Sequence, residues 1–131
     1  MSSNKETAVR FFEGQDRNKG APLQEICSPT YMACIGGGPA IDLAGHTQFG
    51  EMFYAAFPDM SHRIDDMIAE GDKVTVRFTL NGTHRGEFMG VPATGKSVSI
   101  PALALLRFED GKVAELWGEF NGLGVMQQLE A

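Results

Sequence analysis

The residue types best suited to chemistry are gathered near the carboxyl end of the chain, in residues 112–121. An Asp-Gly turn precedes this stretch and no Pro interrupts it, which predicts a β-strand. Because strand side chains alternate between two faces, Glu115, Trp117, Glu119 and Asn121 share one of them. This face combines the chain's only Trp with carboxylates and an amide, a mixture that neither a core nor a fully solvated surface favours. It predicts one wall of a cavity that holds a small molecule.

The composition is that of one globular domain spanning residues 1–131. Apolar residues make up 43% of the chain and charged residues 21%, and the length is sufficient for a hydrophobic core. The 17 acidic and 11 basic residues give a net charge of −6, which argues against nucleic acid or an anionic membrane as a partner. The longest apolar run, residues 100–106, is too short to span a membrane. Because no apolar signal segment opens the sequence, we expect a cytoplasmic protein with Cys27 and Cys34 as reduced thiols.

The periodicity of apolar residues changes from helical to strand-like at Pro58. Helices are predicted over residues 3–20 and in the segment that ends at Pro58, with a short third helix between them. Beyond Pro58 a period of two predicts strands that form an antiparallel sheet, over residues 62–69, 74–81, 97–108 and 112–121. Helices followed by a strongly curved sheet indicate an α+β fold. We expect four rings to pack on the concave side of this sheet: Phe11, Phe12, Phe49 and Phe53.

Two motif-like features lack the context that their chemistry requires. Residues 90–97 match the phosphate-loop pattern GxxxxGK[ST], but a β-like segment broken by Pro101 follows, where a phosphate loop needs a helix. The three histidines, His46, His62 and His84, are not spaced as metal ligands. We therefore expect no metal, no nucleotide and no other cofactor.

Two long segments, FPDMSHRIDDMIAEGDKVTVRFTLNGTHRGEFMGVPATGKSV and RFEDGKVAELWGEFNGLGVMQQL, resemble the SnoaL-like polyketide cyclase family, whose bacterial members are often labelled ester cyclases. This family belongs to the NTF2-like superfamily. The resemblance implies a cone-shaped α+β barrel that is often dimeric through its sheet. It also implies ring closure by a cofactor-free intramolecular aldol condensation.

The resemblance further implies an acid–base residue four positions after the strand Trp, where the family has Asp and this chain has Asn121. The position before the Trp, often His in the family, is Leu116. An amide does not exchange a proton near neutral pH, but it donates a hydrogen bond to an enolate oxygen. Glu119 lies about 7 Å from Asn121 on the same face, and a carboxylate in an apolar cone has a raised pKa suited to a base. We therefore predict Glu119 and Asn121 as the catalytic pair, with Trp117 walling the pocket.

Five more residues are predicted to contact the ligand. His62 alternates with Ile64 along its strand and can face the pocket. His84 has two interpretations, a place at the pocket rim or a hydrogen-bonded histidine in a turn. The remaining three are aromatic residues of the helices: Phe12, Phe49 and Phe53.

Three functions remain open from the sequence. The first is a cofactor-free cyclase or isomerase acting on a hydrophobic carbonyl compound, and the second is a pocket that binds such a ligand without chemistry. The third is a structural module whose sheet serves to dimerise. In each case we expect a homodimer through the outer face of the sheet, because Leu116 and Phe120 would point away from the pocket and need cover.

Overall fold

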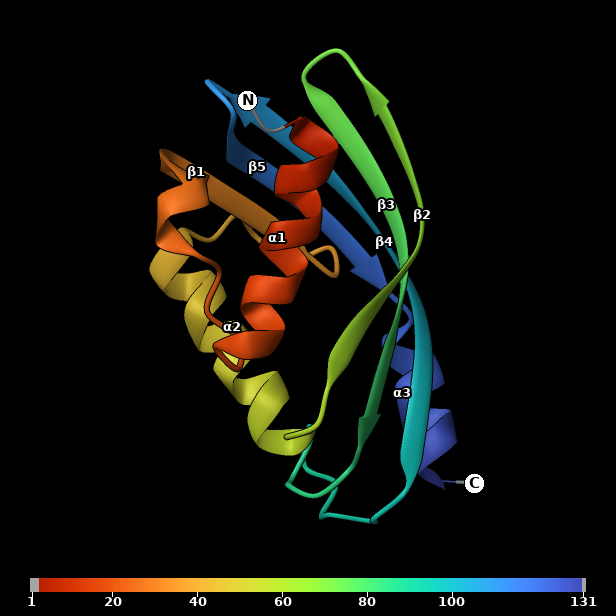
Figure 1. Cartoon of the computed structure of the whole chain (residues 1–131). Helices are drawn as coiled ribbons and strands as arrows, with labels where there is room; N and C mark the ends of the chain where they lie inside the picture. Colours follow the sequence, from red (N-terminus) through yellow and green to blue (C-terminus); the bar gives the residue numbers. More distant parts are fainter. Residues whose placement is uncertain (1–2, 131) are drawn as a thin grey trace.

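A computed structural model describes residues 3–130, which form three α-helices, one 3₁₀ turn and five strands (Figure 1). In chain order they are α1 (Asn4–Arg17), the 3₁₀ turn η1 (Gln24–Ile26), β1 (Cys27–Ile35), α2 (Leu43–Ala56), β2 (Ser61–Glu70), β3 (Lys73–Thr83), β4 (Ser97–Glu109), β5 (Lys112–Phe120) and α3 (Gly122–Glu130). The predicted α+β fold is confirmed. The short third helix is a 3₁₀ turn, and the chain closes with a nine-residue helix.

The five strands form one sheet in the order β1-β5-β4-β3-β2. Strands β2 to β5 are antiparallel neighbours, as predicted, but β1 pairs with β5 in parallel, so the sheet is mixed. The expectation of a purely antiparallel sheet was wrong for this strand. Tight turns fix the antiparallel direction of hairpin-connected strands, whereas β1 joins a strand far along the chain and no turn sets its direction.

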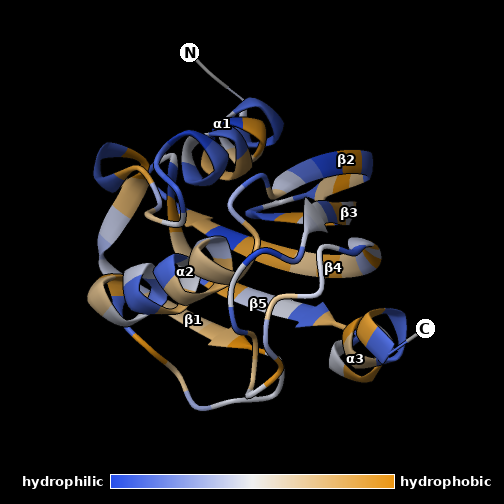
Figure 2. Ribbon diagram, turned by 90° about the horizontal axis from the view of Figure 1, so that it is seen from below, coloured by the Kyte–Doolittle hydropathy of each residue, from blue (hydrophilic) through white to orange (hydrophobic). Residues whose placement is uncertain are grey.

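Helices α1 and α2 lie on the concave side of the bent sheet, and α3 packs against β4 beyond the far end of β5 (Figures 1 and 2). The start of α1 is capped by Ser3, whose Oγ accepts a hydrogen bond from the backbone N–H of Glu6 at 3.2 Å. Asp42 caps α2 in the same way, accepting from the N–H of Gly45 at 2.9 Å. Pro58 follows the end of α2, where the helix cannot continue.

A close backbone contact fixes α2 against the segment that follows α1. A Cβ atom on Gly50 would lie 2.3 Å from the carbonyl oxygen of Gly20, a distance that no other residue tolerates. Gly20 itself has a φ of +116°, in the region that favours glycine. This contact holds the end of the segment after α1 close to the middle of α2.

The hydrophobic core lies between the helices and the concave face of the sheet. Its fully buried side chains include Phe11 of α1, Val76 of β3 and Leu106 of β4. No helix within residues 3–130 combines the length and the apolar character that crossing a membrane requires.

Candidate functional site

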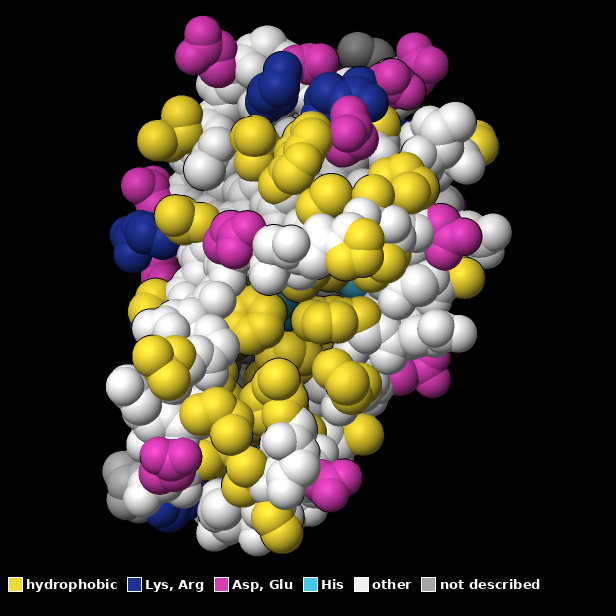
Figure 3. Space-filling view, turned by 180° about the vertical axis from the view of Figure 1, so that it is seen from behind, with side chains coloured by type: hydrophobic (Ala, Val, Ile, Leu, Met, Phe, Trp, Pro, Cys, Tyr) yellow, Lys and Arg dark blue, Asp and Glu magenta, His cyan; other side chains and the backbone are white. Residues whose placement is uncertain are grey.

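A cavity opens between the two helices and the concave face of the sheet. Its cavity volume is about 80 Å³. Figure 3 shows the molecule hollowed on this side, with hydrophobic side chains around the hollow and histidine atoms at its bottom. The walls are mainly aromatic and aliphatic, and the larger apolar residues that form them are Phe12, Ile35, Phe49, Phe53, Met60, Phe78, Leu80, Leu116 and Phe120.

The face of β5 that lines this cavity is the opposite of the predicted one. Leu116, Gly118 and Phe120 line it, and the ring of Phe120 meets that of Phe53 edge-to-face at 5.4 Å. Trp117 is instead on the outer face with 37% of its surface exposed. The expectation that Leu116 and Phe120 point away from the pocket was wrong, because alternation divides a strand into two sets without saying which set meets the helices.

The predicted catalytic pair lies at the end of β5. Glu119 borders the cavity, but its side chain is exposed. Asn121 does not line the cavity; its Oδ1 accepts a hydrogen bond from the N–H of Gly124 at 2.9 Å at the start of α3. Both residues also line a second, shallower hollow beside Arg77 and Leu103. The structure therefore brings Glu119 and Asn121 together, at the rim and the outside of the main cavity.

His62 is the predicted ligand contact with the richest set of partners. It lines the cavity, and its Nδ1 lies 2.7 Å from Oδ1 of Asp16 on α1. Its backbone N–H also donates to Oδ2 of the same carboxylate at 3.0 Å. The hydroxyl of Tyr54, on α2, donates a short hydrogen bond to Oδ1. Three donors from two other elements thus hold one carboxylate behind the cavity wall.

These contacts fix the protonation of the dyad formed by Asp16 and His62. Burial alone would raise the pKa of Asp16, but the hydrogen bonds and charge of His62 and the hydroxyl of Tyr54 outweigh it and lower that pKa below its ordinary value. The carboxylate is therefore ionised near neutral pH and can only accept, so Nδ1 of His62 carries the hydrogen between them. The other ring nitrogen, Nε2, remains available.

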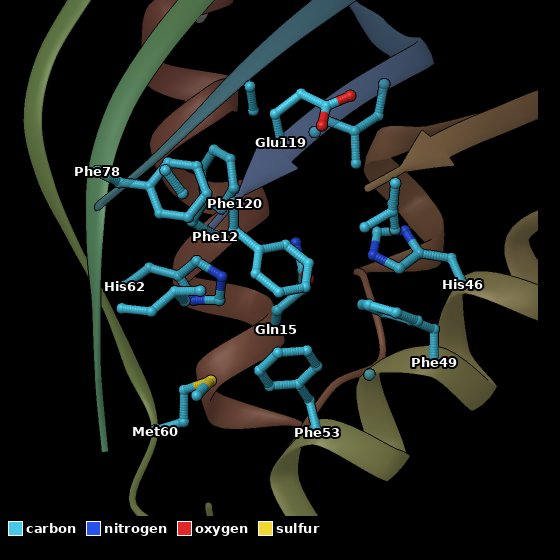
Figure 4. Close-up of a pocket in the computed structure, with 17 residues that line it drawn as sticks. Phe12, Gln15, His46, Phe49, Phe53, Met60, His62, Phe78, Glu119 and Phe120 are labelled. Carbon is cyan, nitrogen blue, oxygen red and sulfur yellow. The ribbon is translucent and has the colours of Figure 1, made fainter. Parts of the chain in front are cut away.

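A second histidine, His46 on α2, lines the opposite side of the cavity (Figure 4). Its Nδ1 lies 2.7 Å from the hydroxyl of Tyr31 on β1, and the two rings stack with an interplanar angle of 9°. Burial, with a smaller contribution from the charge of His62, lowers the pKa of His46 to about 4. His46 is therefore neutral at pH 7. Gln15, which is buried on α1, adds an amide to the same cavity.

The Nε2 atoms of His46 and His62 differ from the Nε2 atom of His84 in their contact with solvent-accessible space. Among the buried polar side-chain atoms of residues 3–130, Nε2 of His84 is the one that lacks both a hydrogen-bond partner and contact with solvent-accessible space. Nε2 of His46 and Nε2 of His62 also have no partner in this part of the chain, so both retain contact with accessible space, and both residues line the cavity.

His84 does not line the cavity, and its predicted contact with the ligand is corrected. It is fully buried, its Nδ1 accepts a hydrogen bond from the N–H of Thr94 at 3.2 Å, and its ring packs on Phe57. The interpretation as a hydrogen-bonded histidine that holds a connection agrees with these contacts. By contrast, Phe12, Phe49, Phe53 and His62 all line the cavity.

Sequence reasoning missed Asp16 and His46, although a signal for each exists. Asp16 follows Phe12 by four residues, which places it on the same apolar face of α1. His46 precedes Phe49 by three residues and Phe53 by seven, so it lies on the cavity face of α2. A titratable residue on an apolar helix face is the signal in both cases. No group of three or more His, Cys, Asp or Glu side chains in residues 3–130 is arranged to hold a metal ion.

Comparison with known proteins identifies the family. The family model described as SnoaL-like polyketide cyclase matches residues 6–129, so the chain belongs to this family, as the resemblance of its segments indicated. No curated protein matches the chain.

Solved structures share the whole fold. AclR from Streptomyces galilaeus, a proposed hydroxylase, is 31% identical with a TM-score of 0.86, over 97% of this chain and 95% of that one. IdmH from Streptomyces antibioticus, a proposed polyketide cyclase, is 27% identical with a TM-score of 0.90, over 99% and 100% of the two chains. A proposed SnoaL-like polyketide cyclase from Jannaschia sp. CCS1 is 28% identical with a TM-score of 0.83, over 98% and 92%.

Proposed function

We propose that the protein is a cofactor-free acid–base catalyst of the cyclase or isomerase type, acting on a small hydrophobic carbonyl compound. The observation that carries this proposal is the dyad of Asp16 and His62 on the wall of an aromatic cavity. The carboxylate orients the imidazole and stabilises the imidazolium that proton uptake creates. The family name and that of IdmH support a polyketide-like compound as the substrate.

The proposed reaction needs no co-reactant. Nε2 of His62 removes a proton from a carbon next to a carbonyl group, and the electron pair moves onto the carbonyl oxygen as an enolate. The enolate carbon attacks a second carbonyl of the same molecule, so one C–C bond forms. The resulting alkoxide takes the proton back from His62. If no second carbonyl is in reach, return of the proton to another carbon gives an isomerase.

Exchange of deuterium into 2-tetralone, a small hydrophobic ketone with acidic α-hydrogens, tests the proton transfer without a known substrate. In D₂O the protein should accelerate loss of the α-proton NMR signal, and His62→Gln should slow this catalysed exchange by roughly two to four orders of magnitude. Asp16→Asn keeps the shape of the dyad but removes its charge, and it should also slow exchange strongly. Catalysed exchange at the unaltered rate in a folded His62→Gln variant would contradict the proposal.

Glu119→Gln is the matched control, because it removes the other carboxylate predicted to carry a proton. If the base is His62, this variant keeps most of the exchange activity, since the side chain of Glu119 is exposed at the cavity rim. A loss confined to Glu119→Gln would instead assign the base to Glu119, with Asn121 as its hydrogen-bond donor.

A ligand-binding protein without chemistry is the second candidate function. It is favoured by Asn121, which stands where the family has its acid and whose Oδ1 caps α3. Gly118→Leu provides a test of binding, because a Cβ atom on Gly118 meets nothing within 4 Å and a larger side chain would fill the cavity. Two results together would support the binding protein. The unaltered protein would bind 2-tetralone without catalysing exchange, and Gly118→Leu would abolish that binding.

A further inference from the structure

The pair formed by His46 and Tyr31 is a second polar wall that the proton transfer proposed above does not use. Figure 4 shows His46 and His62 on opposite sides of the cavity, with aromatic rings and Gln15 between them. Tyr31 is 3% exposed, so its hydroxyl hydrogen cannot be given to bulk water. Within residues 3–130, Nδ1 of His46 is the hydrogen-bond partner that the structure gives this hydroxyl.

The direction of this hydrogen bond decides what His46 presents to the cavity. A buried hydroxyl whose hydrogen finds no acceptor is unfavourable, so Tyr31 donates to Nδ1. Burial raises the pKa of Tyr31 well above its ordinary value, which keeps this hydrogen in place. A neutral imidazole that accepts at Nδ1 carries its own hydrogen on Nε2. That N–H belongs to a residue that lines the cavity, and it has no partner in residues 3–130.

The two histidines therefore present opposite tautomers to the same space. At His62 the acceptor is a carboxylate, so in the neutral imidazole Nδ1 donates and Nε2 carries a lone pair. At His46 the partner is a phenol, so Nδ1 accepts and Nε2 carries the hydrogen. One histidine can take a proton and the other can donate a hydrogen bond, on opposite sides of one molecule bound between them.

We infer that Nε2–H of His46, oriented by Tyr31, donates a hydrogen bond to the carbonyl oxygen of the substrate and stabilises the enolate that forms there. The inference rests on the proposed function and specifies its substrate class: an enolisable ketone whose carbonyl oxygen faces α2 while its acidic C–H faces β2. In this scheme His46 touches the substrate and Tyr31 is a positioning residue.

The tautomer of His46 is measurable in the unaltered protein by two-bond ¹H–¹⁵N correlation of the imidazole nitrogens at pH 7.5. We expect the Nε2–H tautomer at His46, and Tyr31→Phe should populate the Nδ1–H tautomer because Nδ1 loses its donor. A predominant Nδ1–H tautomer at His46 in the unaltered protein would overturn the inference, irrespective of the results for the variants.

The hydrogen bond itself is tested by comparing 2-tetralone with tetralin, which has the same two fused rings and no carbonyl oxygen. The unaltered protein should bind the ketone roughly three- to tenfold more tightly than the hydrocarbon, as measured by ligand titration followed by NMR. The double variant Tyr31→Phe/His46→Phe removes both polar partners and leaves no orphaned hydroxyl, so it should lose this preference. A preference that survives in the folded double variant would overturn the inference.

His62→Gln distinguishes this inference from the proposed function. The preference for the ketone should persist in that variant, because the acceptor oxygen faces His46 and an accepting carbonyl gains nothing from a lone pair on His62. If catalysed exchange does not depend on His62 while the preference depends on His46, the proposed base is wrong and the carbonyl site stands. If exchange depends on His62 but the preference for the ketone does not depend on His46, His62 remains the proposed base and the proposed carbonyl site is wrong.

Discussion

Both faces of strands β4 and β5 carry large apolar residues, yet these residues meet different surroundings. The inner face carries Leu106 and Leu116, which are buried under α1 and α2. The outer face carries Leu103 and Trp117, which are 52% and 37% exposed. Hydrophobicity alone therefore does not determine which face of a strand becomes the core. The helices decide this by covering one face, and the other face remains available for a different contact.

A matched pair of Leu→Ala variants on β4 should show the largest difference between the faces. Leu106 is fully buried, so Leu106→Ala should lower the free energy of unfolding by about 2–5 kcal/mol. Leu103→Ala removes the same atoms from the exposed face and should change it by about 0.5 kcal/mol or less. Urea denaturation at a low protein concentration measures both values. Equal losses would mean that the two faces are equally buried in solution.

The helices that cover the inner face carry groups whose protonation is tied to folding. His46 has a folded pKa of about 4 against 6.5 in the ordinary state, so the unfolded chain binds more protons between these values. Stability should therefore fall by on the order of 3 kcal/mol as the pH drops from 6.5 to 4, and stay level above that range. Asp16, whose folded pKa is lowered, adds a loss only as the pH falls below 3.8.

Denaturation midpoints of the unaltered protein and of the double variant Tyr31→Phe/His46→Phe between pH 4 and 7.5 test this dependence. The double variant should be flatter over that range, because it has no imidazole at position 46 to protonate on unfolding. The same slope in both proteins would place the titrating group elsewhere.

The outer face is the surface through which we predict a homodimer. Paired residues Ile68, Leu105, Trp117 and Cys34, from β2, β4, β5 and β1, lie on one row across the sheet with Thr75 of β3 between the first two. Its exposed apolar residues include Ile68 at 65% and Leu103 at 52%. Light scattering at micromolar concentration should give twice the mass of the chain.

Leu103→Glu should shift that mass towards the single chain while leaving the fold intact. Leu123→Glu is the matched control, because Leu123 is 70% exposed on α3 and does not belong to the sheet face. A monomer in the unaltered protein, or equal effects of the two variants, would contradict a dimer through the sheet.

The sequence predicted the layout of this fold better than it predicted the site. Helical and strand periods, the capping Ser3 and the stop at Pro58 are local signals, and they located most elements correctly. The cavity-facing side of β5 was inverted because Leu116 and Trp117 are both apolar, and only packing against α1 and α2 distinguishes them. The dyad was missed because Asp16 and His62 are 46 residues apart, and helix–sheet packing alone brings them together.

The smallest effect should come from the ion pairs of the outer face, although one of them is short. The guanidinium of Arg107 lies 2.6 Å from Glu115 and 2.9 Å from Glu109, on a surface that water and salt reach. Because solvent screens such pairs, Glu115→Gln should leave the urea midpoint within experimental error of the unaltered protein, both in dilute buffer and in 0.5 M salt. A loss as large as that of Leu106→Ala would mean that the outer face is shielded from solvent. The dimer predicted above would provide that shield. The urea midpoints should therefore be measured again at a protein concentration where the dimer forms. A loss of stability in Glu115→Gln that grows with protein concentration would place Arg107 inside the interface.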